Sequence, residues 1–192
     1  PTQETFARLL QQNGYKTGIV GKWHLVDQDG RPSNPGIAGF DYFAFKMGAG
    51  GPYYDSTGYL QNPVLGSKEI QKRNYSGYIT DNITDLAIKG MEQMKGGPFL
   101  MAIQYFNAHR PFDPPHKYEH LYDSVQIPEP ATFWDDYHSR SAAAREARMR
   151  IEDMMDFNPP KDLTRRQRRQ WSYQQLMRHF LATLKAQDDN IG

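Results

Sequence analysis

The chain of 192 residues contains no cysteine, which excludes a disulfide framework, a thiolate metal site and a cysteine nucleophile within it. It also lacks any apolar run near the roughly 20 residues that a helix needs to cross a bilayer. Its first residues do not have the basic stretch and apolar core of a signal peptide. Net charge is almost absent, at +1, so we expect neither nucleic acid nor an acidic membrane as partner.

The residues that are present suffice for one well-buried domain, since 38% of them are hydrophobic and 23% are charged. The first residue is not Met, and the last helical pattern stops abruptly at residues 188–192. We therefore expect the sequence to be an internal piece of a longer protein.

The first 25 residues have the pattern of a helix followed by a buried strand. Thr2 can cap a helix over about 3–13, which Gly14 is placed to end. The expected buried face of this helix carries apolar residues at the i, i+3, i+4 spacing: Phe6, Leu9 and Leu10. The apolar run 17–21 then predicts a strand, with Lys22, Trp23 and His24 at its end.

The rest of the chain alternates between irregular, helical and extended patterns. Residues 27–76 are rich in Gly, Pro, Asn and Tyr without a sustained period, which predicts a long irregular excursion. A buried strand is expected at 99–106, and charged helical patterns at about 139–155 and 164–190. A helix beginning at Thr80 is predicted to bury a face formed by Ile83, Leu86, Ala87, Met91 and Met94.

This alternation predicts an α/β fold, in which a mixed, mostly parallel sheet is flanked by helices and joined by long irregular loops. In such sheets reactive groups gather at the carboxyl ends of the strands. Two histidine-containing segments, around His24 and His109, follow predicted strands. They are the first candidates for a functional site.

Lys22 and His24 lie two residues apart at a strand end. If the extended geometry continues, both side chains project to one side and Trp23 faces away. An ammonium group neutralises charge that develops on the oxygens of a tetrahedral anion, and an imidazole transfers a proton near neutral pH. The spacing alone fits an anion-processing site, but it also fits a surface lysine and a loop histidine.

The segment from Gly14 to Leu25, GYKTGIVGKWHL, resembles the second signature of the type I sulfatases. The later segments GFDYF (39–43) and YITD (78–81) are similar to the family in the same order and spacing. Residues 98–100 and 108–115 resemble its strand and Pro-His-x-Pro loop, although Ala108 stands where proline is usual. With DDNIG at 188–192, the resemblance spans nearly the whole chain.

Membership of this family implies an alkaline-phosphatase-like α/β fold, and residues 1–192 would be the central part of the catalytic domain. It also implies a bound calcium ion and a formylglycine nucleophile, made by a maturation enzyme from Cys or Ser in a Cys/Ser-x-Pro/Ala-x-Arg motif. The one segment with this spacing, SAAAR at 141–145, lies in a predicted helix far after the signature at 14–25. The resemblance therefore places the formylglycine upstream of Pro1 and the calcium ligands outside these residues.

By the same resemblance, Lys22 binds the sulfate group and the hydroxyl of the nucleophile, and His24 takes up a proton. His109 contacts the sulfate and protonates the leaving sugar oxygen, and Arg110 beside it is expected to bind substrate. Asp188, Asp189 and Asn190 resemble a calcium-binding pair, but they follow a helical pattern rather than an apolar strand. We expect them to be helix residues and assign no metal ligand.

Segments 50–55 and 127–137 look like parts of the glycan sulfatases that act on sulfated glucosamine or related sugars. The substrate implied is a sulfated carbohydrate, and the family is usually periplasmic, extracellular or lysosomal. Aromatic residues, 13% of the chain, gather in these loops and suit stacking against sugar faces, although they also pack long loops.

Three other functions fit parts of the pattern. A phosphate or phosphonate hydrolase of the same superfamily places similar demands on Lys22 and His24. An inactive relative keeps the pocket and binds anions or carbohydrate without turnover. The cluster Arg165, Arg166, Arg168 and Arg169 could serve a nucleic-acid-binding helix, although no recognition motif surrounds it and a solvated helix surface explains it equally well.

Overall fold

The computed structural model describes residues 4–25, 33–47, 52–67, 69–154 and 156–192. These fall into two compact units: residues 1–109 with 186–192, and residues 110–185. Each unit is described by itself below. No helix within the described residues is both long enough and apolar enough to span a membrane.

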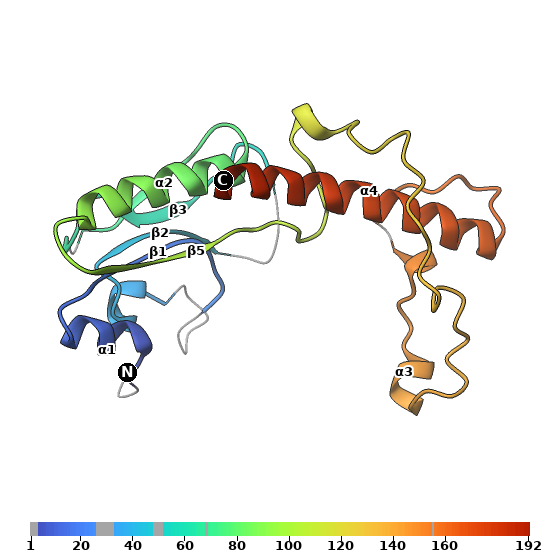
Figure 1. Cartoon of the computed structure of the whole chain (residues 1–192), viewed down its shortest axis with the longest axis horizontal. Coiled ribbons are helices and arrows are strands. Elements are labelled where there is room, and N and C mark those ends of the chain that lie inside the picture. Colours follow the sequence, from blue (N-terminus) through green and yellow to red (C-terminus); the bar gives the residue numbers. More distant parts are fainter. Residues whose placement is uncertain (1–3, 26–32, 48–51, 68, 155) are drawn as a thin grey trace. The chain divides into compact units, whose positions relative to one another are not determined.

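The first unit is built around a sheet whose described strands have the order β4-β3-β2-β1-β5 (Figure 1). Strand β1 (Lys16–Trp23) pairs in parallel with both β2 (Tyr42–Met47) and β5 (Phe99–Gln104). Strands β3 (Tyr59–Asn62) and β4 (Gln71–Arg73) extend the sheet through antiparallel pairings. The structure thus confirms a mixed α/β sheet, with half of its strand pairings parallel.

The prediction of a wholly irregular excursion over 27–76 is wrong, because β2, β3, β4 and the 3-10 turn η1 (Pro35–Ala38) lie within it. The strands were hidden because β2 is buried on both faces and shows no alternation, while β3 and β4 have only four and three residues. The segment 26–32 of that prediction lies outside the described residues.

Helix α1 (Phe6–Gln12) and helix α2 (Ile79–Met94) lie on opposite sides of this sheet (Figure 1). Below it, Ile19, Trp23 and Phe43 pack into one core cluster that includes Ala7 of α1. Above it, the Tyr42 hydroxyl donates to the Leu86 carbonyl of α2 at 2.9 Å, and burial raises the pKa of this tyrosine to about 12. Packing on both faces of the sheet holds the strands, and therefore their carboxyl ends, in place.

The expected buried face of α1 is wrong. Phe6 and Leu9 are 59% and 46% exposed, whereas Ala7 is fully buried. The reason is a close approach: a Cβ atom on Gly39 would lie 2.8 Å from the Arg8 backbone nitrogen, so the helix docks through its smallest side chain. Its N-cap is Thr5, whose hydroxyl accepts from the Arg8 amide, while the predicted cap Thr2 lies outside the described residues.

Helix α2 confirms the predicted apolar face, with Ile83, Leu86, Ala87 and Met94 buried and Met91 half-buried. It begins one residue before the predicted cap Thr80 and ends before Gly96. The strand predicted at 99–106 exists as β5, but it is not buried in this chain, since Phe99 and Ile103 are more than a third exposed. Among the described residues β5 pairs only with β1, so one of its edges has no strand beside it.

Gly21 allows β1 and β5 to approach each other just before Lys22. Its φ of +112° is rare for residues with a side chain, and a Cβ atom there would lie 2.0 Å from the Gln104 carbonyl oxygen. Only glycine fits this position. The backbone that presents Lys22 is therefore held directly against the end of β5.

The second unit consists of loops packed along helix α4 (Arg165–Ile191), whose last residues, from Ala186, belong to the first unit. The helix predicted at 164–190 is confirmed, and Asp188, Asp189 and Asn190 are helical as expected. The helix predicted at 139–155 is wrong. Among the described residues of that range only α3 (Ala142–Glu146) and the 3-10 turn η3 (Ile151–Asp153) form, and another such turn, η2, covers His116–Tyr118.

Candidate active site

The carboxyl end of β1 carries Lys22, Trp23 and His24 in the order that the sequence predicts. The Trp23 indole is buried in the lower core and its Nε1 donates to the Ser33 carbonyl at 2.8 Å, which anchors the strand end. Because side chains alternate along a strand, Lys22 projects to the opposite face from Trp23. Lys22 is half-buried and His24 is exposed.

Lys22 and His24 line one cavity of about 380 Å³ at this strand end. The other described lining residues are Trp23 and Leu25 from the same segment, and Gln104 and Tyr105 from the end of β5. The cavity therefore combines an ammonium group and an imidazole beside the carboxyl ends of two parallel strands. This is the place where an α/β sheet presents its functional groups.

His109 follows β5 by five residues and is half-buried. Its backbone amide donates to the Phe106 carbonyl at 2.8 Å, and its own carbonyl accepts from the Tyr53 hydroxyl at 2.5 Å. His109 is not among the residues that line the cavity around Lys22 and His24. The structure places Lys22 and His24 at the end of β1 and His109 after the neighbouring parallel strand β5, without bringing His109 into that cavity.

The loop that carries His109 is held by groups that the sequence did not single out. The Thr80 hydroxyl, in the first turn of α2, donates to the Asn107 side-chain oxygen at 2.5 Å, and Thr84 and Tyr105 share a hydrogen bond of 2.8 Å. The Tyr53 ring, which is buried, stacks on Tyr78 with centroids 5.8 Å apart. Long sequence separations hide such supports, because each partner alone is an ordinary polar or aromatic residue.

Replacing Tyr53 by phenylalanine tests the support of His109. The variant loses the hydrogen bond to the His109 carbonyl, which is worth about 1 kcal/mol, so we expect kcat/KM of the full-length enzyme to fall about fivefold. Tyr75→Phe is the matched control, since its hydroxyl bonds the Gln61 side chain of β3 at 2.9 Å and not His109. Equal kinetic losses in both variants would contradict a specific role for Tyr53.

Lys46 is a further basic residue that the sequence did not single out. It is the register partner of Lys22 in the parallel pairing of β1 with β2. Its side chain is buried, its Nζ has no hydrogen-bond partner among the described residues, and burial lowers its pKa. Burial of a lysine without a carboxylate partner disfavours its charged form, which is the cause of the lowered pKa.

Arg110, the predicted substrate-binding arginine, belongs to the second unit. Its guanidinium makes a two-pronged ion pair with Asp156, with both nitrogen–oxygen distances at 2.7 Å, and the Asp156 side chain is only 6% exposed. A planar guanidinium matches a carboxylate in this geometry. To bind substrate, Arg110 must use the guanidinium N–H groups that do not bond Asp156, or its ion pair with Asp156 must break.

The described residues do not fit a calcium site. No group of three or more His, Asp or Glu side chains among them is arranged to hold a metal ion. Asn190, one of the residues that resembled a calcium ligand, instead donates from its side chain to Asp81 of α2 at 2.8 Å.

Comparison with known proteins decides the family. The sequence model of the sulfatase family matches residues 1–192, the whole chain. The chain belongs to the sulfatase family. Its mixed sheet is accordingly part of the alkaline-phosphatase-like fold that the signature at 14–25 implied.

Two curated sulfatases indicate how the chain relates to longer relatives. The N-acetylglucosamine-6-O-sulfatase of Bacteroides thetaiotaomicron is 33% identical over 99% of this chain, which spans 40% of that protein. The uncharacterized sulfatase YdeN of Escherichia coli is 32% identical over 60% of this chain and 24% of its own length. The chain thus spans less than half the length of these sulfatases.

Solved structures agree with the fold. BT4656, in complex with its substrate D-glucosamine-2-N,6-O-disulfate, matches all of this chain over 45% of its own length, with a TM-score of 0.81 and 31% identity. Ps i-CgsB, in complex with a neocarrahexaose, matches 96% of this chain with a TM-score of 0.52 and 16% identity, which supports the fold alone.

Proposed function

We propose that the full-length sulfatase to which this chain belongs hydrolyses sulfate esters on a glycan, with a glucosamine 6-sulfate-type sugar as its substrate. The observation that carries the proposal is the cavity at the end of β1, where Lys22 and His24 of the sulfatase signature lie together. Similarity to an N-acetylglucosamine-6-O-sulfatase and to a glucosamine-disulfate complex supports the choice of sugar.

In the reaction, the bond between sulfur and the sugar oxygen breaks, and water supplies the hydroxyl that leaves with the sulfate. The Lys22 ammonium binds the sulfate oxygens and stabilises the negative charge that they carry in the transition state. His24 accepts a proton at the end of β1, and His109 donates one to the departing sugar oxygen. Arg110 assists binding of the anionic substrate if its ion pair with Asp156 opens.

A formylglycine, when present, supplies a hydroxyl nucleophile to this site. The only segment of the chain that satisfies the Cys/Ser-x-Pro/Ala-x-Arg pattern, SAAAR at 141–145, is the N-cap and body of helix α3. The proposal therefore includes a nucleophile from another segment and a maturation enzyme as partner. The described residues offer no ligand set for calcium, so the ligands of a calcium ion would also come from other segments of the full-length protein. A periplasmic, extracellular or lysosomal location stays a prediction.

The test is sulfate release by the full-length protein, co-expressed with a formylglycine-generating enzyme, from a panel that includes glucosamine 6-sulfate and the matched phosphate ester. Calcium-dependent sulfate release is the expected result. Release of phosphate alone would assign the protein to the phosphoryl hydrolases of the superfamily. Absence of both reactions in protein with verified formylglycine would leave an inactive binder and overturn the proposal.

A further inference from the structure

The loop 127–137 of the second unit is fastened along helix α4 by hydrogen bonds. The Gln174 side chain bonds both the amide and the carbonyl of Ile127, at 3.0 and 2.8 Å, and it is buried. The Tyr173 hydroxyl donates to the Pro128 carbonyl at 2.7 Å. These contacts bring the aromatic residues that follow in the loop against the first half of α4.

A cavity of about 340 Å³ lies between this loop, η3 and α4. Three aromatic side chains, Phe133, Tyr137 and Tyr173, line it together with Arg150 and Arg169. Phe133 and Tyr173 pack with ring centroids 4.9 Å apart. A few charged groups among apolar rings are the composition of a site that binds a small polar ligand.

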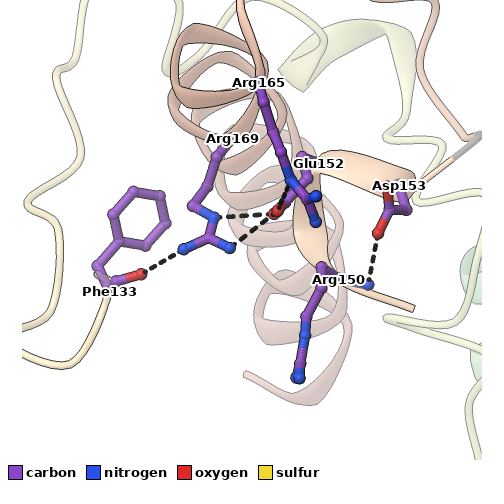
Figure 2. A network of polar contacts seen from close by, with 6 residues as sticks. All are labelled: Phe133, Arg150, Glu152, Asp153, Arg165 and Arg169. Atoms are coloured by element: carbon purple, nitrogen blue, oxygen red, sulfur yellow. Dashed lines mark hydrogen bonds and ion pairs between the residues drawn. The ribbon is translucent and has the colours of Figure 1, made fainter. Parts of the chain in front are cut away.

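Glu152 holds the guanidinium groups of Arg165 and Arg169 in place (Figure 2). Its side chain is 1% exposed and accepts from Arg169 at 2.8 Å through both oxygens, and from Arg165 at 3.0 Å. Figure 2 shows the two guanidinium groups converging on this carboxylate from α4. The basic cluster 165–169 is therefore not simply a solvated helix face, since two of its four arginines bind a buried carboxylate.

Arg150 is held differently. Its guanidinium lies 4.0 Å from the centre of the Tyr137 ring, and one of its terminal nitrogens donates to the Ala144 and Arg145 carbonyls. No carboxylate pairs with this guanidinium among the described residues, although Asp153 accepts from the Arg150 backbone amide at 3.2 Å. Arg166 stacks in the same way on Trp134 at 4.1 Å.

We propose that this cavity binds an acidic saccharide, with Arg150 contacting a sulfate or carboxylate group and the aromatic side chains packing against the sugar ring. In and around it, four guanidinium groups (Arg150, Arg165, Arg166 and Arg169) outnumber three carboxylates, Glu152, Glu129 and Asp153. The excess of positive charge selects an anion, and the rings select a ligand with apolar faces. A guanidinium that is already oriented on an aromatic ring loses little freedom on binding.

The experiment measures binding rather than turnover, in full-length protein that carries Lys22→Ala to weaken the sulfate site at the end of β1. A heparin-derived sulfated disaccharide is titrated by calorimetry, with the desulfated, carboxyl-reduced disaccharide for comparison. We expect Arg150→Gln to weaken binding about tenfold or more, since a hydrogen bond to a charged group is lost. Phe133→Leu is expected to weaken it severalfold through loss of ring packing.

Arg148→Gln is the matched control, because it removes the same charge two residues away from an exposed side chain that does not line the cavity. Binding should be unchanged in it. Thermal unfolding checks that each variant is folded. If Arg150→Gln does not fold, the binding of Phe133→Leu tests the proposal instead. The proposal is overturned if both cavity variants bind like the parent, if the uncharged disaccharide binds equally well, or if a single-stranded oligonucleotide binds more tightly at physiological salt. Sulfate release by protein with Lys22 intact is scored separately, so either proposal can fail alone.

Discussion

Replacing Lys22 by alanine in the matured full-length protein is expected to lower kcat for sulfate-ester hydrolysis about 100- to 1000-fold. The ammonium group is the fixed cation in the cavity at the end of β1, and removal of one group that stabilises developing oxyanion charge costs that much in other enzymes. Because the charge is needed most in the transition state, kcat should fall more than the affinity for substrate.

Lys16→Ala is the matched control for this variant. Lys16 begins the same strand, six residues earlier, so it lies on the same face of β1 but at the opposite end of the sheet. Its loss should leave kcat within about twofold, as expected for a half-buried residue outside the site. Turnover of Lys22→Ala near that of the parent would remove Lys22 from the mechanism, and an equal fall in both variants would indicate damage to β1 instead.

The groups at the strand ends could be predicted from sequence because their chemistry and their local structure coincide in one short segment. The apolar run before Lys22 predicts a strand, Gly14 ends the helix that precedes it, and the signature at 14–25 is contiguous. The position of the cavity then follows from the general geometry of parallel strands. Local information was enough for this part of the site.

The supports of the site depend on contacts between residues far apart in the chain, which no local pattern reveals. Tyr53 reaches the His109 carbonyl across 56 positions, and β2 is buried on both faces, so its sequence shows no alternation. Likewise, the spacing of Phe6 and Leu9 predicted that they are buried, whereas α1 docks through the close approach of Ala7 and Arg8 to Gly39. Tertiary packing overrode the helical periodicity there.

The ion pairs of the arginine cluster could not be predicted from the sequence either, for the same reason. Arg165 and Arg169 are one helical turn apart, so both reach the same side of α4, but their partner Glu152 lies 13 and 17 positions earlier in a segment predicted to be part of a helix. Nothing in the sequence marks Glu152 as buried. Because Glu152 is buried, Arg165 and Arg169 hold η3 against α4 within the second unit instead of being purely solvated surface residues.

Replacing Glu152 by glutamine is expected to destabilise the second unit by roughly 3 kcal/mol, because Arg169, whose side chain is 19% exposed, keeps its charge without a counterion. Burial raises the pKa of Glu152, but hydrogen bonds from Arg169 and Arg165 outweigh it and hold the pKa at about 2, against 4.5 for a free side chain. A carboxylate with a depressed pKa in the folded state stabilises fully above pH 4.5, and this contribution is lost as pH falls toward 2.

Hydrogen exchange of the amides in η3 and the first half of α4 measures this effect within the full-length protein. Protection should fall about 100-fold in Glu152→Gln at pH 7, and the variant should lack the loss between pH 4.5 and 2 that the parent shows. Glu146→Gln, an exposed glutamate at the end of α3, is the matched control and should exchange like the parent. Parent-like protection in Glu152→Gln would mean that the buried ion pair contributes no net stability, as happens when the cost of removing both charges from water equals their attraction.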